Sequence, residues 1–210
     1  MDLPPAGGAG GVTASARPVP APEHAPWWNV LPIAVMSGGW LGPLALFWLA
    51  VWGPMRPYAD AGPLTPGHAP YTAALALCVA AWWVPAAWLR PRRWEMDGGV
   101  YEALGVRAFR SLVPDGDRVN RARRGRDPHF RLVPHRSAAA AFVRRTEAGE
   151  RGHGVLLLMG AVSSAYAWQI GWRGWAVYLG AGNLLVNLYP LLLQRYTRAR
   201  LVRLLARRGR

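Results

Sequence analysis

Four stretches of the chain contain no Asp, Glu, Lys or Arg, and charged segments separate them. They cover residues 25–55, 69–89, 154–172 and 174–194. A helix of about 20 apolar residues is long enough to cross the roughly 30 Å hydrocarbon core of a bilayer. One such stretch would also fit a buried helix of a soluble protein, but four of them leave too little polar sequence to cover them. The pattern therefore predicts an all-α integral membrane protein with four transmembrane helices.

The basic residues are distributed unevenly around these stretches. All of them are arginines, and they concentrate in residues 90–153 and 195–210, whereas the other two connections carry only Arg56 and Arg173. The positive-inside rule then places the 90–153 loop and the C-terminus in the cytoplasm, and four spans bring the N-terminus to the same side. A net charge of +14 would otherwise suggest a nucleic-acid partner. Because the charge follows the topology, we expect the lipid bilayer as partner and no nucleic acid.

The same pattern divides the chain into five segments. Residues 1–26 are mostly Pro, Gly and Ala, which cannot form a core, and are predicted to be a disordered leader. The first two transmembrane helices occupy residues 27–89, a basic amphipathic cytoplasmic region occupies 90–153, the last two helices occupy 154–194, and a basic tail occupies 195–210.

Local patterns predict helices outside the apolar stretches as well. Apolar periodicity indicates an amphipathic helix over Val100–Leu112. Ser137 is a suitable N-cap for a helix over residues 138–149, which we expect to continue into the third span. A short terminal helix is predicted over Leu201–Leu205.

A small group of titratable residues lies at the start of the third span. Glu147, Glu150 and His153 are three residues apart, so on one continuous helix they share a face about 120° wide. A carboxylate one turn from an imidazole fixes its tautomer and stabilises the imidazolium, as a general base requires. Spacing alone slightly favours the alternative, in which these are solvated charges at headgroup level and Glu147 forms an i,i+4 pair with Arg151. One histidine and two carboxylates are too few ligands for a metal, and we expect none.

A second polar stripe runs along the fourth apolar stretch. Asn183 and Asn187 are one turn apart, and Gln194 continues their face toward the cytoplasmic end. Amides in lipid point into the helix bundle, where they either hold helices together or bind a substrate. If spans three and four are neighbours, this stripe faces Glu150 and His153. Arg195 and Arg198 follow it, either as anchors to anionic headgroups or as ligands for the phosphates of a donor.

Roughly residues 100–205 resemble the CrtO-type glycosyl-4,4'-diaponeurosporenoate acyltransferases, a family of membrane enzymes in carotenoid biosynthesis. The final run is the most specific part of the resemblance. The residues that carry it are Tyr101, Val106 to Phe109, Leu112 to Gly116, Thr146, Glu147, Glu150, His153, Asn183, Asn187, Pro190 and Gln194 to Leu201.

The resemblance implies transfer of a fatty acyl group, with acyl-CoA as co-substrate and no bound cofactor, to a sugar hydroxyl of a glycosylated carotenoid or related isoprenoid. It also implies a multi-pass protein of the bacterial inner membrane. We hypothesise that His153 is the general base, that Glu150 orients it, and that Glu147 assists proton transfer. Asn183, Asn187 and Gln194 would bind polar acceptor groups or the thioester carbonyl.

A different class of function fits the same composition. A chain with 12 tryptophans and a glycine-rich first span is also compatible with a non-catalytic transmembrane subunit that packs within a larger, pigment-binding membrane complex. Copurification with a membrane-protein partner at fixed stoichiometry would distinguish that alternative from an enzyme.

Overall fold

The computed structural model describes residues 27–53, 67–113, 116–131, 133 and 136–207, so the predicted leader, residues 1–26, lies outside it. No strand occurs in these ranges, and the all-α prediction is confirmed. The helices are α1 (Trp27–Trp52), α2 (Ala69–Ala80), α3 (Gly99–Ala103), α4 (Val106–Leu112), α5 (Asp117–Arg126), α6 (Arg136–Gln169), α7 (Arg173–Asn183) and α8 (Tyr189–Arg207), with 3-10 turns at Ala81–Trp83, Ala86–Leu89 and Arg93–Glu95 and a π-helical segment at Leu184–Leu188.

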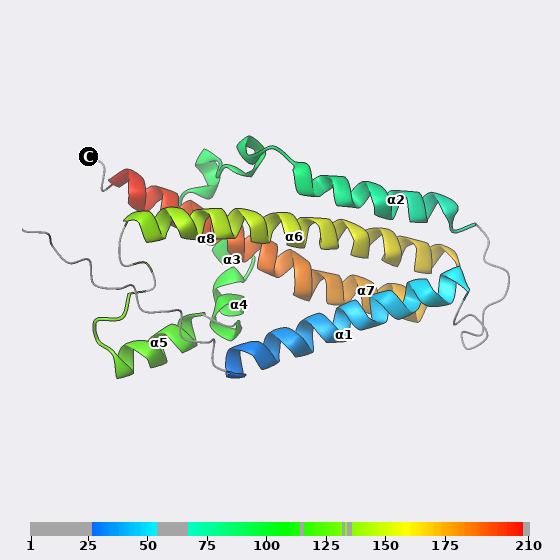
Figure 1. Ribbon diagram of the computed structural model, residues 1–210, viewed down its shortest axis with the longest axis horizontal. Helices are drawn as coiled ribbons and strands as arrows, with labels where there is room; N and C mark the ends of the chain where they lie inside the picture. Colours follow the sequence, from blue (N-terminus) through cyan, green and yellow to red (C-terminus); the bar gives the residue numbers. More distant parts are fainter. Residues whose placement is uncertain (1–26, 54–66, 114–115, 132, 134–135, 208–210) are drawn as a thin grey trace, which may run out of the picture.

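The long helices form one elongated bundle around α6 (Figure 1). Helix α6 contacts α2, α7 and α8, and α1 packs against α7. In Figure 1, α5 lies toward the end of the bundle at which α6 begins and α8 ends, and α3 and α4 lie between it and the middle of the bundle, whereas the turn between α6 and α7 lies at the opposite end. The arginine-rich segments therefore gather at one end of the bundle, which we call the basic end.

Helix α6 is a single uninterrupted helix of 34 residues. At about 1.5 Å per residue it is roughly 50 Å long, so it runs from the basic end through the whole bundle. The predicted continuation of the 138–149 helix into the third apolar stretch is thus confirmed. Glu147, Glu150 and His153 lie on this one helix, as their spacing required.

The fourth apolar stretch is not a simple span. It forms α7, then the π-helical segment, and then α8, which continues without interruption to Arg207. The prediction of a separate short helix over Leu201–Leu205 is therefore wrong. A π segment widens the helix by about one residue per turn and is frequent at functional sites. Here it contains Asn187 and directly follows Asn183.

The second apolar stretch also departs from the prediction. Helix α2 has only 12 residues, and the chain leaves the helical conformation at Val84, where ψ is 130°. Pro85 explains this ending, because proline disfavours a helical conformation in the residue before it. The amphipathic helix predicted over Val100–Leu112 is interrupted as well, since Gly105 adopts a left-handed φ of 74° between α3 and α4.

Two helical segments are long and apolar enough to cross a membrane, Ile33–Trp52 and Arg173–Ala206. Only 28% and 22% of their apolar windows are buried inside the protein. Helix length and composition thus support membrane crossing for two of the four predicted spans among the residues described.

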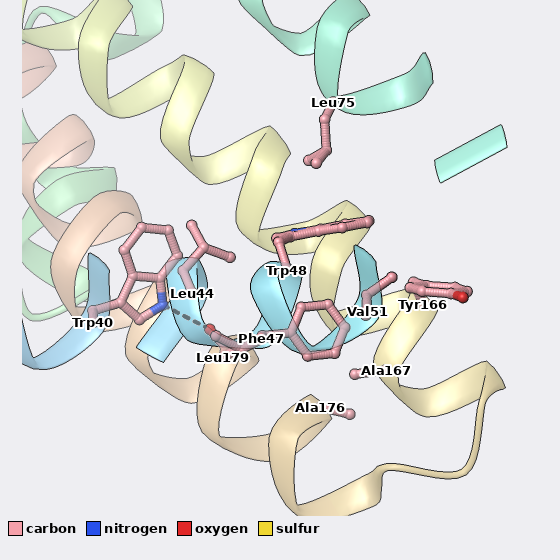
Figure 2. Close-up of a cluster of buried hydrophobic side chains, with 10 residues drawn as sticks. All are labelled: Trp40, Leu44, Phe47, Trp48, Val51, Leu75, Tyr166, Ala167, Ala176 and Leu179. Atoms are coloured by element: carbon pink, nitrogen blue, oxygen red, sulfur yellow. Dashed lines mark hydrogen bonds between the residues drawn. The ribbon is translucent and has the colours of Figure 1, made fainter. Parts of the chain in front are cut away.

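The largest hydrophobic core joins α1 to α6 and α7 (Figure 2). Phe47 and Tyr166 are completely buried there. The indole nitrogen of Trp40 donates a hydrogen bond of 3.0 Å to the carbonyl of Leu179 (Figure 2). A Cβ atom on Gly182 would lie 2.4 Å from the Trp40 ring, so only glycine permits this close helix contact. This core borders the polar cluster described next, since Gly182, against which Trp40 packs, directly precedes Asn183.

Candidate active site

A chain of hydrogen bonds connects α6 with the π-helical segment. The side-chain nitrogen of Asn183 donates to the carbonyl of Leu157 at 2.8 Å. The side-chain nitrogen of Asn187 donates to the Asn183 oxygen at 2.8 Å, and the Asn187 oxygen lies 3.4 Å from Nδ1 of His153. Both asparagines are buried. The predicted meeting of the asparagine stripe with His153 is therefore present in the structure.

The order of donors and acceptors in this series of hydrogen bonds determines the tautomer of His153. The Leu157 carbonyl can only accept, so the amide nitrogen of Asn183 must face it and its oxygen must face Asn187. Asn187 then turns its oxygen toward the imidazole, which requires a proton on Nδ1. This leaves the lone pair on Nε2 as the basic site.

Burial also favours the neutral imidazole. His153 is partly buried just before the charge-free stretch 154–172, and burial lowers the pKa of its imidazole, although the Asn187 hydrogen bond opposes this effect. Gly160 supports the arrangement from α6, because a Cβ atom at this position would lie 2.5 Å from Cγ of Asn183. The asparagine amide thus packs directly on the bare backbone of α6.

A second cluster, which we call the ion-pair network, lies toward the basic end. Nη1 of Arg195 is 2.5 Å from one oxygen of Glu150, and Nη2 of Arg198 pairs with the other oxygen. Nε of Arg195 also donates to Glu95 at 2.8 Å. Arg198 is 1% exposed, Glu95 1% and Glu150 5%, so three of these four charges are removed from solvent. The network joins α6, α8 and the turn before α3.

Local sequence holds Glu95 in place. It ends a 3-10 turn, accepts a hydrogen bond of 2.5 Å from the backbone N–H of Arg92, and accepts another from the hydroxyl of Tyr101. Burial would raise the pKa of the Glu95 carboxyl, but these bonds and Arg195 outweigh it, so the pKa lies below its usual value. Burial and the carboxylate of Glu95 raise the pKa of Tyr101 to about 12, so it remains a neutral donor.

The segment that carries Glu95 also docks on α8 through tyrosines. Tyr196 donates to Glu102 at 2.9 Å, and its ring packs against Tyr101. Gly98, with a φ of 86°, turns the chain here, and a Cβ atom on it would lie 2.9 Å from the Tyr196 ring. The network therefore fixes residues 92–102 against α8.

The structure assigns some predicted residues different partners from those expected. Glu150 pairs with the two arginines, and His153 contacts Asn187, so the geometry does not support the hypothesis that Glu150 orients His153. Glu147 is partly exposed and forms no hydrogen bond or ion pair with the described part of the chain. Gln194 packs against Gly149, where a Cβ atom would lie 3.0 Å from its Nε2.

Glu95 and Tyr101 belong to the ion-pair network, and sequence reasoning did not assign them to the site. One feature of the sequence could have pointed to Glu95 as a site residue: it is the first acidic residue after Asp60 and follows three closely spaced arginines. Its partner Arg195 is 100 residues away, which no local pattern reveals. Within the described residues, no group of three His, Cys, Asp or Glu is arranged to hold a metal ion.

The fold and the two clusters define an all-helical protein with long apolar helices and a buried polar site near its basic end. The family model for CrtO, glycosyl-4,4'-diaponeurosporenoate acyltransferase, matches residues 85–207, and the chain belongs to this acyltransferase family. This range starts earlier than the resemblance noted from residue 100 and includes Glu95 as well as every other residue of the two clusters. No curated protein and no solved structure matches the chain.

Proposed function

We propose that this protein is an integral membrane acyltransferase that moves a fatty acyl group from an acyl donor to a sugar hydroxyl of a glycosylated carotenoid or related isoprenoid lipid. The observation that carries this proposal is the hydrogen-bonded chain from Leu157 through Asn183 and Asn187 to His153. It presents a neutral, oriented imidazole beside apolar helices.

The proposed reaction uses Nε2 of His153 as a general base. It removes the proton of the acceptor hydroxyl while the oxygen attacks the acyl carbonyl of a thioester such as acyl-CoA. The resulting imidazolium is stabilised by the oxygen of Asn187. When the tetrahedral intermediate collapses, the C–S bond breaks and the imidazolium returns the proton to the leaving thiolate. We assign the Gln194 amide of α8 to polar groups of the acceptor or to the thioester carbonyl, to which its N–H can donate. We assign the Glu147 carboxylate of α6 to assisting proton transfer.

The ion-pair network has a positioning role in this proposal. Arg195 and Arg198 are already paired with Glu95 and Glu150, and Arg198 is buried, which argues against their use for donor phosphates. By joining α8 to α6 near His153, the network keeps the asparagines in register with the imidazole.

A bilayer location is supported by side chains that face outward. On α1, Ile33 is 53% exposed and Val35 is 63% exposed, and on α7 Val177 is 62% exposed. Such apolar faces require lipid or a protein partner to cover them. We therefore place the protein in the bacterial inner membrane, with its basic end and C-terminus toward the cytoplasm and its acceptor dissolved in the lipid.

The direct test is an assay of the purified protein in lipid nanodiscs with acyl-CoA and a glycosylated carotenoid. We expect mass spectrometry to detect an acceptor whose mass is increased by one acyl group. Absence of this product with a series of acyl donors, together with copurification of another membrane protein at fixed stoichiometry, would instead support a non-catalytic subunit.

A further inference from the structure

A cavity lies beside the 3-10 turns that connect α2 to α3. It has a volume of about 460 Å³ and is lined by Ala87, Trp88, Arg90, Pro91 and Arg92. We propose that this cavity binds the phosphate group of an acyl-bearing amphiphile. The proposal rests on the membrane location proposed above, and it assigns a binding role to two arginines that the ion-pair network does not use.

The charge of the cavity has no counter-ion among the residues that the structure describes. Neither the Arg90 nor the Arg92 side chain forms an ion pair with any residue that the structure describes. The nearest acidic residue along the chain, Glu95, is engaged by the Arg195 guanidinium and by the backbone N–H of Arg92. Two guanidinium groups at one cavity are well suited to the several oxygens of a phosphate.

The apolar wall of the cavity indicates an amphiphile rather than free phosphate. Trp88 is 73% exposed, and the neighbouring Trp83 and Trp94 are 71% and 55% exposed. Exposed tryptophans of this kind concentrate at the level of lipid headgroups, where one side of the ring contacts acyl chains. An amphiphile whose phosphate lies at the two arginines would thus have its acyl chain beside the ring of Trp88, the tryptophan that lines the cavity.

Trp82, five residues before the first residue that lines the cavity, contacts the helix that carries His153. The carbonyl of Trp82 accepts a hydrogen bond of 3.3 Å from Arg151 on α6, and the Trp82 ring lies 3.8 Å from the Cβ position of Gly152. Beyond the cavity residues along the chain, Glu95 is bound by Arg195 of α8. The residues that line the cavity are therefore held between Trp82, which contacts α6 immediately before the proposed base, and Glu95, which is bound to α8.

Two sources can supply such a phosphate: the acyl donor, if it is a coenzyme A thioester, and the headgroup of a membrane phospholipid. The test measures binding of coenzyme A and of short-chain phosphatidylglycerol, in separate titrations, to the purified full-length protein in a neutral detergent. The double variant R90Q/R92Q removes both charges from the cavity. The matched control is Arg93→Gln, which removes the next arginine along the chain, a residue that does not line the cavity.

We expect the double variant to bind at least one of the two probes about tenfold more weakly or worse, as the loss of charge-assisted hydrogen bonds implies, while Arg93→Gln binds as the wild type does. Weakening for coenzyme A alone identifies the donor, weakening for phosphatidylglycerol alone identifies the lipid, and weakening for both supports the shared phosphate chemistry. Unchanged binding in the double variant, an equal loss in Arg93→Gln, or no binding by the wild type would overturn the proposal. These titrations require no turnover, so their result is independent of whether the protein transfers acyl groups.

Discussion

Replacing Glu150 with alanine is expected to destabilise the folded protein by about 3–5 kcal/mol, as is typical when one partner of a buried ion pair is removed. Arg198 is 1% exposed and Glu150 supplies its carboxylate partner, while Nε and Nη1 of Arg198 have no partner among the described residues. Without Glu150, a buried guanidinium would remain uncompensated. The measurement is thermal and denaturant unfolding of the purified protein, followed by tryptophan fluorescence.

Glu147 provides the matched control, because it lies one turn earlier on the same face of α6 and pairs with none of the described residues. Glu147→Ala is expected to change the stability by no more than about 0.5 kcal/mol. Removing both partners of the pair, as in E150A/R198L, should recover much of the loss, since no buried charge then remains unpaired. Equal stabilities of the Glu150→Ala and Glu147→Ala variants would contradict the assignment of Glu150 to a structural network.

The largest expected effect on activity comes from His153. In the acyl-transfer assay, His153→Ala should lower kcat by about 10²- to 10⁴-fold, the usual contribution of a general base, without a large change in stability. The imidazole is partly buried, and among the described residues its polar contact is with Asn187. His129→Ala is the control, because this exposed histidine lies between α5 and α6 and should keep full activity. A His153→Ala variant that turns over as fast as the wild type would exclude the general-base role.

Local periodicity was sufficient to predict α6 and the shared face of Glu147, Glu150 and His153. A helix fixes the relative direction of residues three apart, and no proline interrupts this part of the sequence. The spacing of Asn183 and Asn187 likewise indicated one polar face. Whether that face meets α6 depended on helix packing, which the structure shows through the His153 contact.

The partners of the charged residues were not predictable in the same way. Glu150 has both an imidazole three residues away and two arginines on α8, and the sequence spacing favours the imidazole because only that contact is local. The structure instead pairs it with arginines 45 and 48 residues away. A buried carboxylate gains more from two guanidinium groups than from a neutral imidazole, so packing overrode the local pattern.

Backbone irregularities account for the remaining differences. Pro85 ends the second helical stretch and Gly105 divides the helix predicted over Val100–Leu112, and both residues were visible as possible breaks. The π segment at Leu184–Leu188 has no such marker, since its residues are ordinary helix formers apart from Asn187. It is recognisable only from the hydrogen bonds of the folded chain.

The central claim is that the two asparagines, and not Glu150, orient His153 as a neutral base. The most direct measurement is ¹⁵N NMR of protein labelled at histidine, with the His153→Ala variant used to assign the His153 signals. The account predicts a neutral ring at pH 7 with the proton on Nδ1 and a bare Nε2, and loss of this tautomer preference in Asn187→Leu. A proton on Nε2 alone, or a fully protonated imidazolium at pH 7, would contradict it.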